Sequence, residues 1–513
     1  MKQYVKIEAR NINRFIFNTM CIQKIILPIA ASAVFSGCRA SMPERPNVIV
    51  MIVDDMGYGD VSALNPDSKI RTPNIDRLVR EGVHFTDGYS NSSLSTATRY
   101  GLMTGRYTFR GVLKSYVTSG YDDLIIEQGR MTLASMLKGV GYNTAVVGKW
   151  HLGLGWQKTP GADSLIHGDN FIPDIINIDF TKPVTKGPGT CGFDYSFIFP
   201  GAADMSPYCY LENGMPLVTE MVPEPGVRNV RGKALRPGIR DIDYKPEGCL
   251  DIFTEKMIQY LKSVDRRKPF FLYAPSNAPH IPWEPAPQFA GSSGAGPYGD
   301  FVLHFDHTLG RILNTLDELD MTKNTLFIFL SDNGATWTDR EINTYNHLSN
   351  HIFKGSKGDS WEGGHRVPFI VRYPAQFKGG GSSSLMVCAT DVMATIAEIV
   401  GVKLPKDAGE DSFSFYPALK NPSRTKPVRE NLILHSGYGM FALRMDEWKF
   451  IDGQGSGGFN KTKRETPECP TGQLYNLKND VGESTNVACD HPEKVTKMKK
   501  ELERLIVAGR SRK

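Results

Sequence analysis

Short apolar runs alternate with amphipathic stretches along most of the chain. The apolar runs are rich in β-branched and aromatic residues and cover residues 48–53, 144–147, 269–274 and 325–330. Runs of this length are typical of strands that are buried on both faces of a parallel sheet. The stretches between them predict helices over residues 73–81, 132–138, 301–319 and 391–400. The alternation predicts an α/β fold with a large, mostly parallel sheet flanked by helices.

Two parts of the chain depart from this pattern. Residues 156–246 are rich in Gly, Pro, Asp and aromatic residues and have little periodicity, which indicates a long functional loop region. From about residue 426, short alternating segments predict an antiparallel sheet, and the residues from His491 onward predict a closing amphipathic helix. We therefore expect a main domain over residues 46–425 and a smaller C-terminal α+β subdomain over residues 426–513.

The first residues have the features of an export signal. Lys24 precedes the apolar run 25–35, which is too short to span a bilayer as a mature helix. A Ser-Gly-Cys sequence ending at Cys38 follows, so residues 1–37 resemble a bacterial lipoprotein signal, with Cys38 as the lipidated new N-terminus. Simple signal cleavage, a start at Met20 and a buried N-terminal helix are the alternatives. We expect an exported bacterial lipoprotein, periplasmic or at the cell surface, that contacts the membrane only through its lipid anchor.

Charge and cysteine content narrow the possible classes of protein. The 60 Lys and Arg residues and 55 Asp and Glu residues give a net charge of +5. This excess is too small and too evenly spread to indicate a nucleic-acid partner. Six cysteines follow Cys38, and export would permit disulfides. Cys469 and Cys489 could form one bridge, but the sequence alone does not decide the pairing, and no spacing indicates zinc.

Polar side chains follow each of the four buried strands. They are Asp54 and Asp55 after the first strand, Lys149 and His151 after the second, His280 after the third, and Asp332 and Asn333 after the fourth. The carboxyl ends of parallel strands meet at one edge of a sheet, where open α/β sheets place their ligands. Carboxylate and amide oxygens suit Ca²⁺ or Mg²⁺. Any one of these groups alone could be ordinary loop packing, but their recurrence at four strand ends predicts one site.

The stretch Ser95-Thr96-Ala97-Thr98-Arg99 predicts a loop that turns into a helix N-terminus. The free N–H groups of a helix N-terminus stabilise an anion. Arg99 adds a cation that can hold a carboxylate, phosphate or sulfate with two hydrogen bonds. For this stretch alone, a Ser/Thr-rich loop with a solvated arginine is the alternative. Nothing obvious in the sequence activates Ser95, so its unmodified hydroxyl would be a poor nucleophile.

This stretch, together with the Thr-Gly-Arg that ends at Arg106, resembles the signature of the type I sulfatases. The third position is Ala97, where proline is commoner in that family. Three further motifs of the family occur in the same order. They are Gly-Lys-Trp-His-Leu-Gly from Gly148, Ser-Asp-Asn-Gly from Ser331, and Glu-Gly-Gly-x-Arg-Val-Pro from Glu362.

The resemblance extends over essentially the whole chain from Pro46 onward. It implies an alkaline-phosphatase-like sandwich, with residues 46–425 as a sulfatase catalytic domain. In the family the first signature residue, here Ser95, is oxidised to formylglycine, whose hydrated form is the nucleophile. A serine at this position implies maturation by a radical-type sulfatase-maturating enzyme of anaerobic bacteria.

The resemblance also implies a role for each polar strand end. It implies one Ca²⁺ held by oxygens of Asp54, Asp55, Asp332, Asn333 and the modified Ser95. It implies a catalytic set made of Ser95, Arg99, Lys149, His151, His280 and Lys357. Within this set, Arg99 and Lys149 would hold and polarise the formylglycine, and His151 would act on its second hydroxyl. His280 and Lys357 would contact the sulfate, with His280 as the proton donor to the leaving alcohol.

Two loops, around residues 204–208 and 298–300, resemble those of sulfatases similar to N-acetylgalactosamine-6-sulfatases, and they suggest the substrate. This likeness implies an exo-acting carbohydrate sulfatase for a 6-O-sulfate of GalNAc or galactose in a sulfated glycan. The candidate sugar contacts are Asp204, His351, His365 and His435. Two alternatives stay open. One is a phosphodiesterase or phosphomonoesterase of the alkaline-phosphatase-like superfamily, whose two-metal members usually need more Asp and His ligands. The other is a non-catalytic glycan-binding lipoprotein with an unmodified Ser95.

Overall fold

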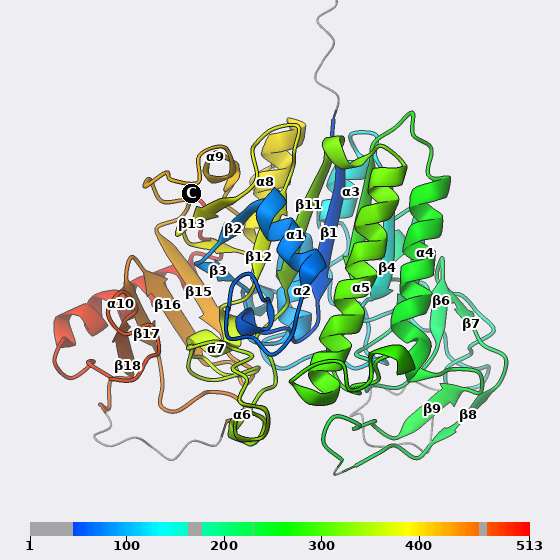
Figure 1. Cartoon of the computed structure of the whole chain (residues 1–513), viewed down its shortest axis with the longest axis horizontal. Coiled ribbons are helices and arrows are strands. Elements are labelled where there is room, and N and C mark those ends of the chain that lie inside the picture. The colour runs from blue at the N-terminus through cyan, green and yellow to red at the C-terminus, as the bar shows by residue number, and fades with distance from the viewer. Residues whose placement is uncertain (1–44, 163–176, 229, 461–468) are drawn as a thin grey trace, which may run out of the picture. The chain divides into compact units, whose positions relative to one another are not determined.

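A ten-stranded sheet forms the centre of the structure, a computed structural model that describes residues 45–162, 177–228, 230–460 and 469–513 (Figure 1). The predicted signal of residues 1–37 and Cys38 lie outside the described residues. From one edge to the other the strands are β13 (Gly381–Ser383), β2 (Val83–Phe85), β12 (Phe369–Arg372), β11 (Thr325–Ser331), β1 (Asn47–Val53), β10 (Phe270–Pro275), β4 (Asn143–Lys149), β5 (Tyr195–Phe199), β6 (Tyr210–Glu212) and β7 (Met215–Leu217).

The middle of the sheet is parallel. β1 pairs in parallel with both β10 and β11, and its Val50 lies opposite Tyr273 and Ile328. β4 continues the parallel order beyond β10, and β5 beyond β4. β12 and β6 run antiparallel to their neighbours. Because the middle strands point the same way, their carboxyl ends lie along one edge of the sheet.

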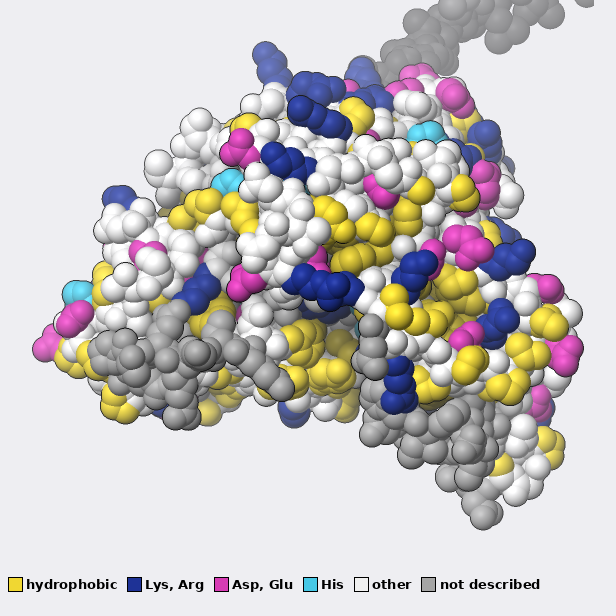
Figure 2. Space-filling model, turned by 60° about the horizontal axis from the view of Figure 1, so that its bottom comes forward, with side chains coloured by type: hydrophobic (Ala, Val, Ile, Leu, Met, Phe, Trp, Pro, Cys, Tyr) yellow, Lys and Arg dark blue, Asp and Glu magenta, His cyan; other side chains and the backbone are white. Residues whose placement is uncertain are grey.

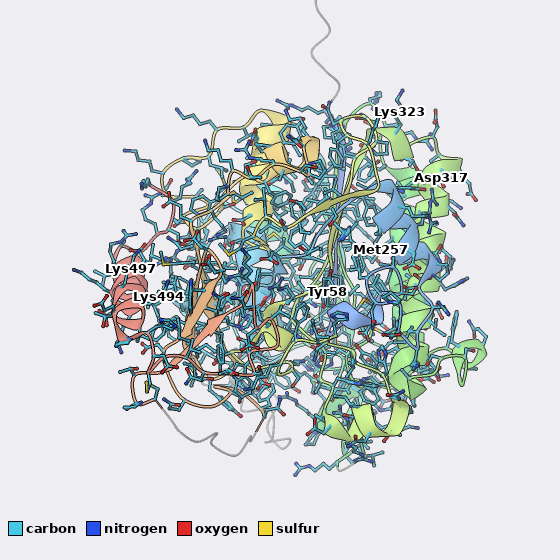
Figure 3. The ribbon with its side chains drawn as sticks, turned by 60° about the vertical axis from the view of Figure 1, so that its left-hand side comes forward. Tyr58, Met257, Asp317, Lys323, Lys494 and Lys497 are labelled. Atoms are coloured by element: carbon cyan, nitrogen blue, oxygen red, sulfur yellow. A yellow bond between two sulfur atoms is a disulfide. The ribbon has the colours of Figure 1, made fainter. Side chains whose placement is uncertain are left out.

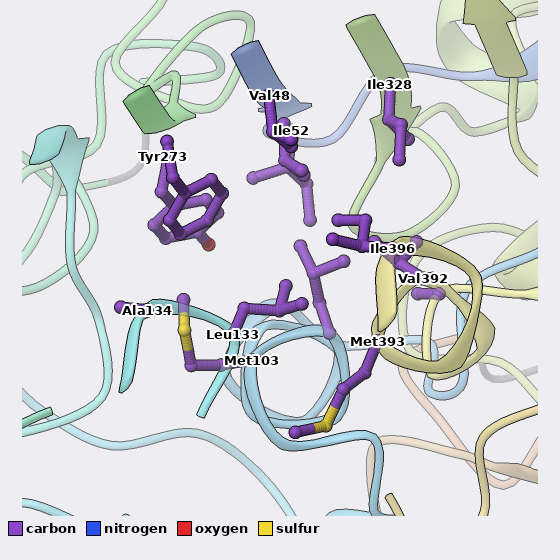
Figure 4. Close-up of a cluster of buried hydrophobic side chains, with 14 of the residues drawn as sticks. Val48, Ile52, Met103, Leu133, Ala134, Tyr273, Ile328, Val392, Met393 and Ile396 are labelled. Carbon is purple, nitrogen blue, oxygen red and sulfur yellow. The ribbon is translucent and has the colours of Figure 1, made fainter. Parts of the chain in front are cut away.

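Two layers of helices cover the sheet. Alternate residues of a strand point to opposite faces, and in β1 both sets are apolar, so each face packs against helices. Val48 and Ile52 of β1 pack in a hydrophobic cluster with residues of α2 (Ser95–Thr104), α3 (Leu133–Lys138) and α8 (Asp391–Val400) (Figure 4). Ile49 and Val53 pack in a second cluster with residues of α1 (Pro73–Glu81), α4 (Cys249–Ser263) and α5 (Gly296–Glu318). The predicted α/β fold with a mostly parallel sheet is confirmed.

The region predicted as a long loop contains strands. The aromatic-rich β5 joins the main sheet beside β4, and β6 and β7 extend that edge. A separate hairpin is formed by β8 (Met221–Glu224) and β9 (Gly238–Asp241). The loop interpretation of residues 156–246 was therefore wrong in part, because these strands are short and the pairing of β5 with the distant β4 leaves no local pattern.

The C-terminal part forms a second sheet. Its antiparallel strands are β15 (Asn431–His435), β16 (Phe441–Met445), β17 (Trp448–Ile451) and β18 (Gln473–Asn476). The closing helix α10 (Pro492–Val507) packs Val495 and Leu502 against this sheet, while Lys497 lies on its exposed side (Figure 3). The structure contains the Cys469–Cys489 disulfide. The domain boundary at residues 425/426 stays a prediction.

Shorter elements complete the described part of the chain. β3 (Gly88–Tyr89) pairs with β14 (Val387–Cys388), and the short helices are α6 (Asp339–Tyr345), α7 (Glu362–His365) and α9 (Tyr416–Lys420). Within the residues that the structure describes, no helix has the length and apolar composition needed to cross a bilayer.

Candidate active site

The predicted strand-end residues meet at the carboxyl edge of the main sheet. Asp54 and Asp55 follow β1, and Lys149 ends β4. His280 lies beyond β10, and Asp332 follows β11. All of these side chains are buried. The parallel order of the strands therefore brings together charged groups that are far apart in the sequence.

Two ion pairs form the floor of this site. Lys149 Nζ lies 2.6 Å from Asp54 Oδ2, and Arg99 Nη2 lies 2.7 Å from Asp332 Oδ2, with all four side chains fully buried. Burial and the neighbouring Asp54 charge raise the pKa of Asp332 to about 6. Burial lowers the pKa of Lys149, although the Asp54 carboxylate opposes the shift. In this low-dielectric environment the charges act strongly on any group placed among them.

Asp55 connects several groups of the site. It accepts hydrogen bonds from Lys357 Nζ at 2.8 Å and from Asn333 Nδ2 at 2.7 Å, and its Oδ2 lies 3.7 Å from His280 Nε2. Its backbone N–H donates to Asp332 Oδ1 at 3.1 Å. Burial raises the pKa of Asp55, but the charges of Lys357 and His280 outweigh it and hold this pKa well below its usual range.

The arrangement fits a metal ion. Ligand atoms of Asp54, Asp55 and His280 lie within 4.8 Å of one another. Asp54 Oδ1 and Asn333 Oδ1 are buried and accept no hydrogen bond from the described residues. A buried oxygen without a partner is costly, and a hard cation such as Ca²⁺ would satisfy both. Asp332 accepts hydrogen bonds from Arg99 and from the Asp55 N–H, and its part in holding a metal ion stays a prediction.

Ser95 is the first residue of the buried helix α2. Its Oγ lies 3.0 Å from His151 Nδ1, and His151 Nε2 lies 2.9 Å from the carbonyl oxygen of Thr118. Because a carbonyl only accepts, Nε2 carries the proton and Nδ1 accepts from the Ser95 hydroxyl. Burial and the charges of Lys149 and Arg99 hold the pKa of His151 well below its ordinary value, so the ring is neutral. The family resemblance implied that His151 acts on the modified Ser95, but the tautomer, which the Thr118 carbonyl selects, could not be recognised from the sequence.

His280 has a defined tautomer. Its Nδ1 donates to the carbonyl oxygen of Ile281 at 2.6 Å, which leaves Nε2 to face Asp55. Burial, and after it the charge of Lys357, lowers the pKa of His280 to about 4. His280 is thus neutral at pH 7 in this structure, with Nε2 as an acceptor.

Three loops are joined beside the site by backbone hydrogen bonds. The Gly358 N–H donates to the Ser93 carbonyl at 2.9 Å, and the Gly437 N–H donates to the Gly358 carbonyl at 2.8 Å. The Ser93 N–H donates to the His435 carbonyl at 3.1 Å. The loop before Ser95 and the loop of Lys357 are therefore both attached to the end of β15. Sequence reasoning missed this junction because it consists of backbone groups.

The four candidate sugar contacts lie in different surroundings. Asp204 is buried, with Oδ1 at 3.9 Å from His280 Nδ1, so it borders the site. His351 is half-buried and lines a cavity of about 630 Å³ that also includes Arg340. His365 is fully buried, and neither of its ring nitrogens has a hydrogen-bond partner among the described residues. His435 Nε2 donates to the Lys114 carbonyl at 2.7 Å. Their roles stay predictions.

The surroundings of His435 predict a pH-dependent stability. Burial lowers its pKa to about 4, although the hydrogen bond to Lys114 opposes this shift. Between pH 6.5 and 4 the unfolded state binds a proton that the folded state does not, so stability falls as pH falls through this range. At pH 5 the cost is about 2 kcal/mol. Urea unfolding at pH 7.5 and at pH 5 gives the free energy of unfolding at each pH. The decrease between the two pH values should be about 2 kcal/mol larger in the unmodified protein than in His435→Gln. An equal loss in both proteins would contradict the prediction.

Comparisons with known proteins agree with this geometry. A family model described as Sulfatase matches residues 46–402. An N-acetylgalactosamine-6-O-sulfatase of Bacteroides thetaiotaomicron is 33% identical, over 94% of this chain and 98% of that protein. Human arylsulfatase A is 30% identical, over 89% of this chain and 85% of that protein. A solved structure from work on glycosaminoglycan metabolism by Bacteroides thetaiotaomicron has 33% identity and a TM-score of 0.78, and the match covers 90% of this chain and 99% of that one.

The fold and these matches define a hydrolase of sulfuric esters. The chain belongs to the sulfatase family. The resemblance of its motifs to that family is thereby confirmed over most of the chain.

Proposed function

We propose that the protein is an exo-acting carbohydrate sulfatase that hydrolyses a 6-O-sulfate of GalNAc or galactose, using a formylglycine made from Ser95. The observation that carries the proposal is the placement of Ser95 at the buried N-terminus of α2, where it hydrogen-bonds to His151. Lys149 and Arg99 are buried in the same site, paired with carboxylates. The 33% identical N-acetylgalactosamine-6-O-sulfatase supports the choice of sugar.

Ser95 and its neighbours would carry out the transfer of the sulfuryl group. A hydrated aldehyde at this position would supply one hydroxyl as the nucleophile that takes the sulfuryl group from the sugar oxygen. The second hydroxyl would then lose its proton and form the C=O bond while the C–O bond to the sulfate breaks, which releases sulfate and restores the aldehyde. His151 Nδ1 already accepts a hydrogen bond from the Ser95 hydroxyl, so it is placed to take a proton from this side chain. Arg99 and Lys149 place two positive charges where negative charge develops on the sulfate oxygens.

The metal site would be built from the side chains of Asp54, Asp55, Ser95, Asp332 and Asn333. Asp54 Oδ1, which lies 3.7 Å from Arg99 Nη2, and Asn333 Oδ1 have no hydrogen-bond partner among the described residues. They support an oxygen-bound ion, and we propose one Ca²⁺. A bound Ca²⁺ supplies Lewis-acid stabilisation of negative charge on the sulfate and on the nucleophile. His280 lies close enough to this cluster to act as a neighbour of the ion as well as of the substrate.

His280 and Lys357 would serve the sulfate and the leaving group. Lys357 Nζ pairs with Asp55, and the Lys357 side chain is 12% exposed, whereas Lys149 and Arg99 are fully buried. His280 Nε2 is deprotonated here, but an anionic sulfate ester beside it would favour its charged form and raise its pKa. The protonated ring could then donate to the leaving sugar oxygen. Asp204, which lies beside His280, is our first choice for a sugar contact.

The biological setting follows from the same proposal. A radical-type sulfatase-maturating enzyme would oxidise Ser95. Residues 1–37 would direct export, and Cys38 would carry the lipid anchor at the periplasmic or outer surface of a bacterium. A sulfated glycan outside the cytoplasm would be the substrate.

The test is sulfate release by a Ser95→Cys protein made in a host that converts cysteine to formylglycine. The panel contains 6-O-sulfated GalNAc, galactose and GlcNAc, their 3- and 4-O-sulfated counterparts, 2-O-sulfated galactose, and a phosphodiester. We expect release from 6-O-sulfated GalNAc or galactose, at least 100-fold faster than from the other esters. Mass spectrometry of the Ser95 peptide confirms that the aldehyde is present. Turnover of the phosphodiester alone, with the aldehyde present, would overturn the proposal.

A further inference from the structure

Three exposed aromatic side chains lie together on the surface. Tyr116, Tyr438 and Phe459, called here the aromatic cluster, are 42%, 65% and 40% exposed. In the part of the chain that the structure describes, no other aromatic side chain is as exposed. Aromatic rings carry a large apolar area and are usually buried. Several rings left in water on one patch therefore point to a ligand.

The rings of the aromatic cluster contact one another. Tyr116 and Tyr438 are parallel, at an interplanar angle of 2° and with ring centres 6.5 Å apart. Phe459 meets both rings edge-on, with its centre 5.7 Å from Tyr438 and 6.4 Å from Tyr116. The three residues come from the segment after α2, the turn between β15 and β16, and the segment after β17. The fold thus assembles one apolar surface from three separate parts of the chain.

One side of the aromatic cluster is attached to the Lys357 loop. The Phe459 ring lies against Gly358, the residue after Lys357, so closely that a Cβ at Gly358 would be 2.7 Å from a ring carbon. Tyr438 follows Gly437, whose N–H donates to the Gly358 carbonyl. The aromatic cluster therefore contacts Gly358, the residue next to Lys357, and Lys357 pairs with Asp55 in the site.

The other side is attached to the segment that supports His151. The Tyr116 N–H donates to the Gly437 carbonyl at 2.9 Å. Two residues later, the Thr118 carbonyl accepts the hydrogen bond from His151 Nε2. The segments that carry the aromatic cluster are thus linked by backbone hydrogen bonds to the Lys357 loop, and one of them also supports His151. The space-filling view shows hydrophobic and basic side chains gathered on the face at the carboxyl end of the sheet (Figure 2).

We propose that the aromatic cluster binds the pyranose ring next to the sulfated sugar of a glycan chain, while the sulfated sugar occupies the active site. This inference rests on the proposed function. A pyranose has a face of C–H groups that packs on an aromatic ring and is attracted by its negative π face. The cluster exposes on the order of 300 Å², which suits one or two sugar rings. A protein partner would need about 800 Å² on each side.

The experiment compares a monosaccharide with a trisaccharide that carries the same 6-O-sulfated sugar at its non-reducing end. The proteins are the mature enzyme and its Tyr438→Ala, Phe459→Ala and Tyr438→Phe variants. We expect the alanine variants to raise KM for the trisaccharide about tenfold, without changing its kcat or the kinetics of the monosaccharide. Tyr438→Phe keeps the ring and should behave like the unmodified enzyme. Val507→Ala, at an exposed site on α10, is the control for loss of apolar surface.

The outcomes separate this inference from the proposed function. Unchanged trisaccharide kinetics in both alanine variants, or an equal change for both substrates, would overturn the role of the aromatic cluster. If the unmodified enzyme releases no sulfate from either substrate, the proposed function fails. Calorimetric titration with the unsulfated trisaccharide then still tests the cluster. Binding that is about tenfold weaker in Tyr438→Ala would support it, and equal or undetectable binding in both proteins would overturn it.

Discussion

Replacing Ser95 with alanine is expected to lower kcat for sulfate release by at least about 10⁴-fold. Alanine offers no oxygen that could be converted to a nucleophile. The fold should persist, because alanine is the best helix former at the start of α2 and only the hydrogen bond to His151 is lost. The free energy of unfolding should therefore fall by no more than about 2 kcal/mol. Sulfated-sugar binding should remain, since Lys149 and Lys357 are unchanged.

Ser92→Ala is a matched control three residues earlier in the same loop. Ser92 Oγ is also buried, but it donates to the His435 carbonyl at 3.0 Å rather than facing His151. Its loss should cost about 1 kcal/mol of stability and less than tenfold in kcat. Sulfate release, a binding isotherm for the sulfated sugar and a urea titration give the three readouts. If Ser95→Ala keeps activity within tenfold of the unmodified protein, Ser95 is not the nucleophile.

The sequence predicted those parts of the site that follow directly from strand positions. Asp54, Lys149 and Asp332 each stand at the end of a buried strand, and parallel pairing makes such ends neighbours whatever the loops do. The apolar runs that mark these strands are local, so one sequence is enough to find them. The strand-end carboxylates and Lys149 could therefore be assigned to one place from the sequence alone.

Other parts of the site depend on contacts that leave no local pattern. The junction of Ser93, Gly358 and Gly437 consists of backbone hydrogen bonds between residues that are 265 and 79 positions apart in the chain. The pairing of β5 with β4 turned part of the expected loop into sheet. The contact of Ser95 with His151 Nδ1 depends on a tautomer that Thr118 selects. Each of these features is set by tertiary packing, which a reading of periodicity does not capture.

A buried ion cluster connects the C-terminal sheet to the Lys357 loop. Lys449 of β17 lies 3.0 Å from Glu362 of α7 and 2.9 Å from Glu483, and all three side chains are fully buried. The Glu362 N–H also donates to Glu483 Oε2 at 2.6 Å. Burial raises the pKa of Glu483 to about 7, although the charge of Lys449 opposes it. Lys449 therefore compensates Glu362, which lies five residues after Lys357, and Glu483, which lies in the C-terminal part of the chain.

Lys449→Met is expected to lower the free energy of unfolding by about 3–5 kcal/mol, because it leaves buried carboxylate charge without its partner. Arg366 still pairs with Glu362, so Glu483 bears most of the loss. The cost should shrink as the pH falls from 8 to 5.5. Without Lys449, the pKa of Glu483 in the folded state should rise further, whereas in the unfolded chain it is about 4.3. Below the folded-state pKa the folded protein therefore binds a proton that the unfolded chain does not, and this binding stabilises it as the pH falls. Urea unfolding at the two pH values measures both effects.

The double variant Lys449→Met, Glu483→Gln separates charge from packing. If uncompensated charge causes the loss, removing the Glu483 charge should restore at least half of the lost stability and should remove the pH dependence. If the loss instead reflects the shape of the methionine, the double variant would be no more stable than Lys449→Met at either pH. If the cluster also holds the Lys357 loop in place, kcat/KM should fall in Lys449→Met and recover with stability in the double variant. Among the described residues the side chain of Lys357 pairs with Asp55, so such an effect would act through the loop.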